Sequence, residues 1–171
     1  MSDYLKSDHV ISILFCCHGN ICRSAMAEAM FRQMIKGAHA EEHFSCDSAA
    51  TSREEIGNGM YAPAVRKLKA EGVPIGNHRA RQMTVSDYNC YDLLIGMDDE
   101  NIRNMTRICH GDPDKKIRKL LSFAGEERSI ADPWYTGNFD ATYRDLTIGL
   151  KALTEDIGLD VHEEKSRQKQ L

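Results

Sequence analysis

Several features that mark particular protein classes are missing from this 171-residue chain. No apolar run approaches the roughly 18 residues that a membrane span needs, so we expect no transmembrane helix. Positive charge is not in excess, since 22 Lys plus Arg stand against 26 Asp plus Glu, and nucleic acid is therefore not an expected partner. No repeat, low-complexity linker or domain boundary is visible. The sequence predicts one domain over residues 1–171, with an ordered core over about 10–160 and a frayed tail over 163–171.

A secretory leader is not evident either, because the first 15 residues begin polar and acidic and precede no small-residue cleavage site. We therefore expect a cytoplasmic protein whose six cysteines are reduced thiols rather than three disulfides. Cys16, Cys17 and Cys22 lie within seven residues of one another. In a reducing compartment such a cluster indicates catalytic or redox chemistry.

Short apolar runs alternate with helical patterns along the chain. The runs predict buried strands at residues 10–16, 44–49, 91–97 and 117–121. Apolar residues at helical spacing predict helices over residues 24–37, 63–71, 98 or 99 to 111, and 139–157. This alternation predicts an α/β fold, with three αβα layers around a central, mainly parallel sheet of about four strands.

The loop after the first strand, CHGNICRS at residues 17–24, is the most specific pattern in the sequence. Ligands of parallel α/β sheets bind at this position, and N–H groups at a helix N-terminus attract anions. Gly19 allows close backbone approach or a positive φ, and Arg23 can hold two phosphate oxygens through its planar fork. The same field stabilises a thiolate at Cys17, which makes it a nucleophile. The residues predicted to bind a phosphoryl dianion are His18, Gly19, Asn20, Ile21, Cys22, Arg23 and Ser24.

The segment LFCCHGNICRSAMAEA resembles the signature loop of the low-molecular-weight protein tyrosine phosphatase family. The likeness continues in order through CDSAATS, NHRARQ, YDLLIGMD and ADPWY. It implies a Rossmann-like, phosphotyrosine phosphatase I-like fold that hydrolyses tyrosine-phosphorylated proteins without metal or cofactor. In that family pattern Cys17 forms a cysteinyl phosphate, Arg23 clamps the phosphate, and Asp132 is the general acid and then the base. Phosphate, vanadate or sulfate would occupy the same anion site.

The resemblance also implies supporting roles around the loop. Cys22 holds the family's second-cysteine position and could trap an oxidised Cys17 as a reversible disulfide. The cleft wall departs from the family pattern at Glu54, where relatives often carry an aromatic or large apolar side chain. A carboxylate there would disfavour acidic peptides and favour basic ones. Trp134 and Tyr135 are expected to flank the cleft. The hydrogen-bond network that holds the loop is expected to consist of Asn20, Ser24, Ser48 and His78.

Three other functions fit parts of the pattern. Thiol-dependent arsenate reductases share this fold and loop but need a nearby cysteine relay pair, and Cys90 and Cys109 are far apart in sequence. Protein-arginine phosphatases resemble a loop with Thr at the position of Ile21, whose apolar side chain favours phosphotyrosine. A non-catalytic phosphate-binding module would usually lose the nucleophile or the acid.

A zinc site is not expected at the cysteine cluster, because the sequence contains no Cys-x2-Cys pair.

Overall fold

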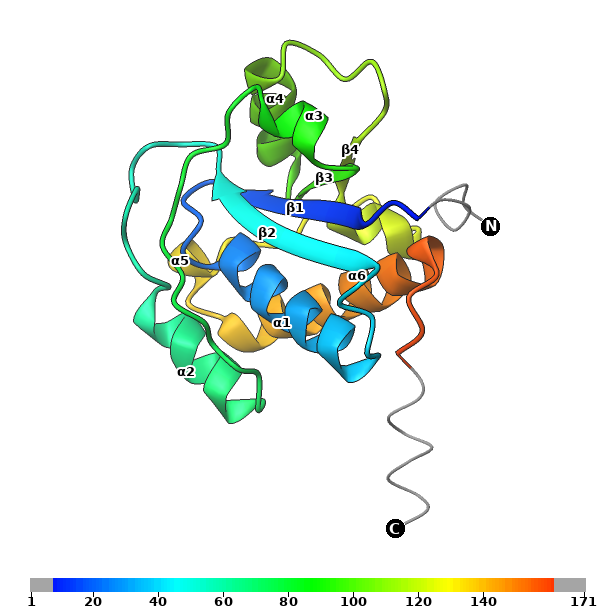
Figure 1. Ribbon diagram of the computed structural model, residues 1–171. Helices are drawn as coiled ribbons and strands as arrows, with labels where there is room; N and C mark the ends of the chain where they lie inside the picture. The colour runs from blue at the N-terminus through cyan, green and yellow to red at the C-terminus, as the bar shows by residue number, and fades with distance from the viewer. Residues whose placement is uncertain (1–7, 162–171) are drawn as a thin grey trace.

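The computed structural model describes residues 8–161, so the tail expected at 163–171 lies outside the described residues. Figure 1 shows the arrangement of its helices and strands. In chain order they are β1 (Ile11–Cys17), α1 (Arg23–Gly37), β2 (Phe44–Ala50), α2 (Ala62–Ala70), α3 (Asp87–Cys90), β3 (Leu93–Gly96), α4 (Asp99–Ile108), β4 (Ile117–Lys119), the 3-10 helix η2 (Leu120–Ala124), α5 (Pro133–Thr136) and α6 (Phe139–Ile157).

The four strands form one parallel sheet in the order β2-β1-β3-β4. β1 lies inside the sheet, where it pairs with β2 over its whole length and with β3 over three residues. Cys17, the last residue of β1, lies opposite Ala50, the last residue of β2. The loops that follow these two strands therefore leave the sheet side by side at its carboxyl edge, which is where ligands of parallel sheets bind.

The side chains of β1 alternate between two apolar layers. Ile13 and Phe15 join the cluster that includes α1, α2 and α6, whereas Leu14 and Cys16 join the cluster formed with α3 and α4. Figure 1 accordingly shows α1, α2 and α6 on one face of the sheet and α3 and α4 on the other. The expected three-layer α/β fold with a parallel sheet of four strands is confirmed.

The predicted helices and strands are present, with corrections at their ends. α6 has the predicted bounds, because its apolar stripe is long and Gly158 ends it with a left-handed φ of 79°. The predicted fourth strand is too long, because Leu120 and Leu121 turn into η2. Three short helices were not predicted: α3, η2 and α5. Each has only four or five residues, too few to show a helical period.

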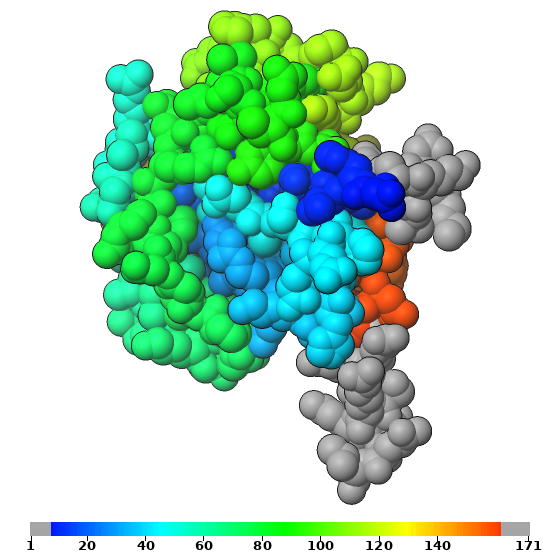
Figure 2. Space-filling view, viewed as in Figure 1, coloured from blue at the N-terminus to red at the C-terminus, as the bar shows by residue number. Residues whose placement is uncertain are grey.

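The face shown in Figure 2 has a hollow of about 430 Å³, where α1 lies recessed between β2 and the segment after α2. Glu28 of α1, Asp47 of β2 and His78 line it. Over residues 8–161, no helix has the length and apolar character needed to cross a bilayer.

Candidate active site

Cys17 ends β1, where the loop to α1 begins, and this residue is only 3% exposed. Its Sγ accepts hydrogen bonds from the backbone N–H groups of Asn20 (3.3 Å) and Ser24 (3.5 Å). The Ser24 hydroxyl lies 3.0 Å from the same sulfur. Three hydrogen-bonding groups and a helix N-terminus thus converge on Sγ, an environment suited to a sulfur that carries negative charge.

Asn20 connects this loop to its surroundings. It is fully buried, and its Nδ2 donates to Ser24 Oγ (2.8 Å) and to Ser48 Oγ (2.9 Å). Its backbone carbonyl lies 2.6 Å from His78 Nε2, and because a carbonyl only accepts, Nε2 carries the proton. The structure therefore brings together Asn20, Ser24, Ser48 and His78, the four residues expected to support the loop.

The left-handed residue of the loop is Asn20, with φ of 60°. A positive φ was one of two roles considered for Gly19, and the structure places it at the next residue instead. Asn tolerates this region better than most side chains because its short amide can hydrogen bond locally. Close approach of the Gly19 backbone to a phosphate stays a prediction; in the structure a Cβ at Gly19 would lie 3.3 Å from Glu55 Cγ, a tight contact.

The donors and acceptors of the network fix its direction. Because an amide nitrogen only donates, Ser24 Oγ accepts from Asn20 and keeps its own hydrogen for Cys17 Sγ. Ser48 in turn donates to Glu28 Oε1 at 2.7 Å, and a carboxylate only accepts. Glu28 is a buried residue of α1 that sequence reasoning did not identify. Its other oxygen pairs with Arg32 at 2.9 Å.

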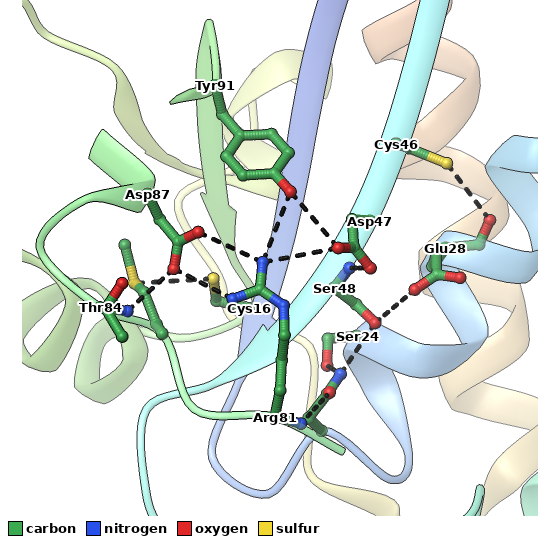
Figure 3. Close-up of polar contacts among 12 residues, drawn as sticks. Cys16, Ser24, Glu28, Cys46, Asp47, Ser48, Arg81, Thr84, Asp87 and Tyr91 are labelled. Atoms are coloured by element: carbon green, nitrogen blue, oxygen red, sulfur yellow. Dashed lines mark hydrogen bonds and ion pairs between the residues drawn. The ribbon is translucent and has the colours of Figure 1, made fainter. Parts of the chain in front are cut away.

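Sequence reasoning also missed Arg81, whose guanidinium lies among Asp47, Asp87 and Tyr91 in Figure 3. Its backbone N–H donates to Asn20 Oδ1 at 3.2 Å. Its guanidinium binds both oxygens of Asp87, at 3.1 and 3.3 Å, and contacts Asp47 at 3.5 Å. Burial alone would lower the pKa of Arg81, but the Asp87 hydrogen bonds and the neighbouring carboxylates raise it above its usual value. Arg81 therefore stays charged and anchors this segment to the sheet.

Arg23 is the cation at the floor of the site, and its side chain is 2% exposed. Nη1 donates to Asp98 Oδ2 (2.7 Å) and to the carbonyl of Ile130 (2.9 Å), and Nη2 lies 3.4 Å from Asp132 Oδ2. Burial lowers the pKa of Arg23, and the Cys17 sulfur and the two carboxylates more than offset it, so the net direction is upward. Asp98 was not predicted as a site residue. Its side chain has two roles, because it caps the N-terminus of α4 and also accepts the hydrogen bond that orients Arg23.

Asp132 approaches the loop from the start of α5. Its Oδ1 caps this helix by accepting from Trp134 N–H at 3.0 Å, which leaves Oδ2 directed at Arg23. The Trp134 ring packs on Tyr61 with centroids 4.7 Å apart, and Tyr135 is 82% exposed. A four-residue helix thus places the expected acid and both aromatic residues on one side of the site.

A pocket of about 100 Å³ opens above Cys17. It unites the three predicted catalytic residues with the predicted cleft walls, and it adds Glu55, which was not predicted. Asn20 and Ser24, which were predicted to bind the phosphate, are fully buried and do not line the pocket. The lining consists of Cys17, His18, Gly19, Ile21, Cys22, Arg23, Glu54, Glu55, Asp132, Trp134 and Tyr135. Within residues 8–161, no group of three or more His, Cys, Asp or Glu side chains is arranged to hold a metal ion.

The model of the low molecular weight phosphotyrosine protein phosphatase family matches residues 12–165. The chain belongs to this family. A curated low molecular weight protein-tyrosine-phosphatase of Bacillus subtilis, YfkJ, is 34% identical over 150 residues, or 86% of this chain and 96% of YfkJ. The human low molecular weight phosphotyrosine protein phosphatase is 36% identical over 153 residues, or 84% of this chain and 94% of the human protein. The crystal structure of YfkJ is similar to the structure of this phosphatase, with a TM-score of 0.85. The match covers 88% of this chain and 96% of the YfkJ chain.

Two substitutions at Asn20 separate its backbone conformation from its hydrogen bonds. Asn20→Gly keeps the positive φ but removes the hydrogen bonds that the Asn20 amide makes with Ser24 Oγ, Ser48 Oγ and the Arg81 N–H, whereas Asn20→Ala also strains the backbone. We expect both to lower stability by about 1–3 kcal/mol, with Ala the worse, and both to reduce kcat. Thermal unfolding and steady-state kinetics test this. Wild-type kcat in Asn20→Gly would show that only the backbone conformation matters.

Proposed function

We propose that the protein hydrolyses phosphotyrosine and other aryl phosphomonoesters through a cysteinyl-phosphate intermediate. The observation that carries this is the arrangement of one sulfur, one guanidinium and one carboxylate around a single pocket of about 100 Å³. Cys17 is the nucleophile, Arg23 the phosphate clamp and Asp132 the general acid and base. The catalytic unit is the single domain over residues 1–171, and it needs no cofactor in this reaction.

The phosphoryl dianion binds against the loop of residues 18–24, whose backbone N–H groups lead into the N-terminus of α1. Arg23 supplies the positive charge. Since Nη1 is held by Asp98 and Ile130, the Nε and Nη2 edge is the part of the guanidinium that faces the phosphate. Held in this way, the guanidinium stabilises the charge that develops on the non-bridging oxygens in the transition state.

Two displacements complete the reaction. Cys17 Sγ attacks phosphorus, the S–P bond forms, and the bond from phosphorus to the phenol oxygen breaks while Asp132 gives its proton to that oxygen. A water molecule then attacks phosphorus as Asp132 takes its proton, the S–P bond breaks, and inorganic phosphate leaves with the Cys17 thiolate restored. Ser24 supports both steps, since its hydroxyl hydrogen is free to donate to Sγ.

Hydrolysis of para-nitrophenyl phosphate tests the proposal directly. We expect turnover without added metal and inhibition by orthovanadate, which resembles the five-coordinate phosphoryl state. Inactivity of the folded protein on this ester would refute the proposal.

Substrate preference separates this function from its alternatives. The same preparation should act on phosphotyrosine far better than on phosphoarginine, since apolar Ile21 lines the pocket where a hydroxyl would help to select a phosphoguanidinium. The opposite preference would favour the arginine phosphatase, and thiol-dependent reduction of arsenate would favour the reductase.

We also infer that Cys22 protects Cys17 from irreversible oxidation. Both thiols line the pocket, and burial, together with Cys17 and Asp132, raises the pKa of Cys22 to about 12. Once Cys17 is oxidised to a sulfenic acid, the Cys22 thiol attacks its sulfur, a disulfide forms and water leaves.

We propose that the protein is located in the cytoplasm. All six cysteines are free thiols and the nucleophile can be oxidised, and a reducing compartment keeps such thiols reduced.

Because the attacking species is the thiolate, the high pKa of Cys22 makes disulfide formation slow at neutral pH. We expect its rate to rise by up to about tenfold per pH unit between about pH 6.5 and 8.5, after one equivalent of peroxide. Peptide mapping by mass spectrometry measures the linkage. In Cys22→Ser, Cys17 should instead progress to sulfinic acid. A map with no bond between Cys17 and Cys22 would remove the idea.

A further inference from the structure

The floor and the mouth of the catalytic pocket carry opposite charge. The floor contains the Arg23 guanidinium and the loop amides, whereas Glu54 and Glu55 line the mouth. The Glu54 side chain is 69% exposed, so it faces whatever enters. Glu55 lies against Gly19 of the loop, and its Oε2 accepts from Asn58 at 2.6 Å. The two carboxylates therefore project from the segment after β2, beside the catalytic loop.

Neither carboxylate is neutralised by a strong cation. Across residues 8–161, Glu54 has one charged contact, with His18 Nε2 at 3.0 Å, and Glu55 has none with Lys or Arg within 4.0 Å. Other acidic side chains near the site are paired, as Asp98 is with Arg23 and Asp87 is with Arg81. The mouth thus keeps an excess of negative charge that a bound substrate would meet.

We propose that Glu54 and Glu55 are specificity residues that select phosphotyrosine flanked by Lys or Arg and disfavour phosphotyrosine flanked by Asp or Glu. This inference rests on the proposed function. With the phosphate on the floor, the tyrosine ring fills the pocket and the peptide backbone crosses the mouth. Neighbouring peptide side chains then lie within reach of the two carboxylates, and opposite charges attract whereas like charges repel.

The opposite wall reinforces the preference for cations. Tyr135 is 82% exposed and Trp134 is 51% exposed, and both line the pocket. An exposed aromatic face attracts Lys and Arg through its quadrupole. A cationic neighbour of the phosphotyrosine therefore meets both carboxylates and aromatic rings at the mouth of the pocket. An anionic neighbour meets no Lys or Arg there, because Arg23 at the floor is the one Lys or Arg among the residues that line the pocket.

Two phosphotyrosine peptides that differ only in having Lys or Glu on both sides of the phosphotyrosine test the proposal. Exposed ion pairs change affinity by about 1.4- to fivefold each. Two attractive pairs in one peptide and two repulsive ones in the other therefore predict a preference of about fourfold or more in kcat/KM for the Lys peptide at low salt. The difference should lie mainly in KM and shrink as salt is added. In Glu54→Gln/Glu55→Gln the two peptides should become nearly equal.

The control variant Glu41→Gln/Glu155→Gln removes the same charge from two exposed positions outside the pocket and should keep the preference for the Lys peptide.

Para-nitrophenyl phosphate separates the specificity inference from the proposed function, because it carries no flanking residues. Failure to hydrolyse it would sink the proposed function itself. Turnover of this ester combined with equal use of both peptides by the wild type, or with a preference that survives in Glu54→Gln/Glu55→Gln, would overturn the specificity inference alone.

Discussion

Cys17→Ser is expected to lower kcat on para-nitrophenyl phosphate by three or more orders of magnitude. Serine preserves the size of the side chain and the hydrogen bonds from Asn20 and Ser24, but its hydroxyl is not ionised at neutral pH and is a poor nucleophile. The positive floor of the pocket is untouched. The variant should therefore still bind orthovanadate and a phosphotyrosine peptide, but it should not hydrolyse the peptide. Calorimetry measures the binding, and steady-state kinetics measure the hydrolysis.

Cys90→Ser is the matched control for this substitution. Cys90 is an exposed thiol on α3, which does not line the pocket, and its replacement should leave kcat unchanged. If Cys17→Ser kept more than about a tenth of the wild-type kcat, the sulfur could not be the nucleophile. If it lost both turnover and anion binding, Cys17 would instead be a structural residue of the loop.

Asp132→Asn should produce a loss that depends on the leaving group. Phenolate, with a conjugate acid of pKa about 10, needs a proton as it departs, and removal of a general acid costs about 10²–10⁴ in rate. Para-nitrophenolate is a much more stable anion and leaves without that help. We therefore expect a large fall in kcat/KM, which reports formation of the intermediate, for phenyl phosphate and phosphotyrosine, and a much smaller fall in kcat/KM for para-nitrophenyl phosphate.

A comparison with Asp132→Ala separates catalysis from folding at this position. Asn retains an oxygen that can accept the Trp134 N–H and cap α5, whereas Ala removes the cap at a cost of about 1 kcal/mol. Both variants should show the same leaving-group dependence, and only Ala should be measurably less stable. Equal losses in kcat/KM for every leaving group would contradict a role for Asp132 as the acid.

The parts of the site that the residue pattern itself predicted are local, whereas Ser48 and His78, which lie 28 and 58 positions from Asn20, were expected only through the family resemblance. The loop of residues 17–24 joins a buried strand to an amphipathic helix, so its position at the sheet edge followed from periodicity and its chemistry from residue types. Asp132 was recognised in a short motif whose own cap and proline start the helix that positions it. These features depend on neighbours within a few residues, which a sequence shows directly.

The missed residues depend on contacts between distant segments. Asp98 is 75 positions from Arg23, and Arg81 is 61 positions from the Asn20 amide that it holds. In sequence, Asp98 looks like an ordinary helix cap and Arg81 like a surface cation. Glu28 is a buried residue of α1 whose link to the site is the hydrogen bond from Ser48 of β2, 20 positions away. Each of these roles is created by packing, which has no local signal.

Trapping of a phosphoryl group on Cys17 tests the central claim most directly. Asp132→Asn should slow hydrolysis of the intermediate more than its formation from para-nitrophenyl phosphate, because the second step also needs Asp132 as base. A rapid denaturing quench during turnover, followed by intact mass measurement and peptide mapping, should find one phosphoryl group per chain on Cys17. A stoichiometric burst of para-nitrophenolate with Cys17 unmodified, or with the phosphoryl group on another residue, would contradict the account.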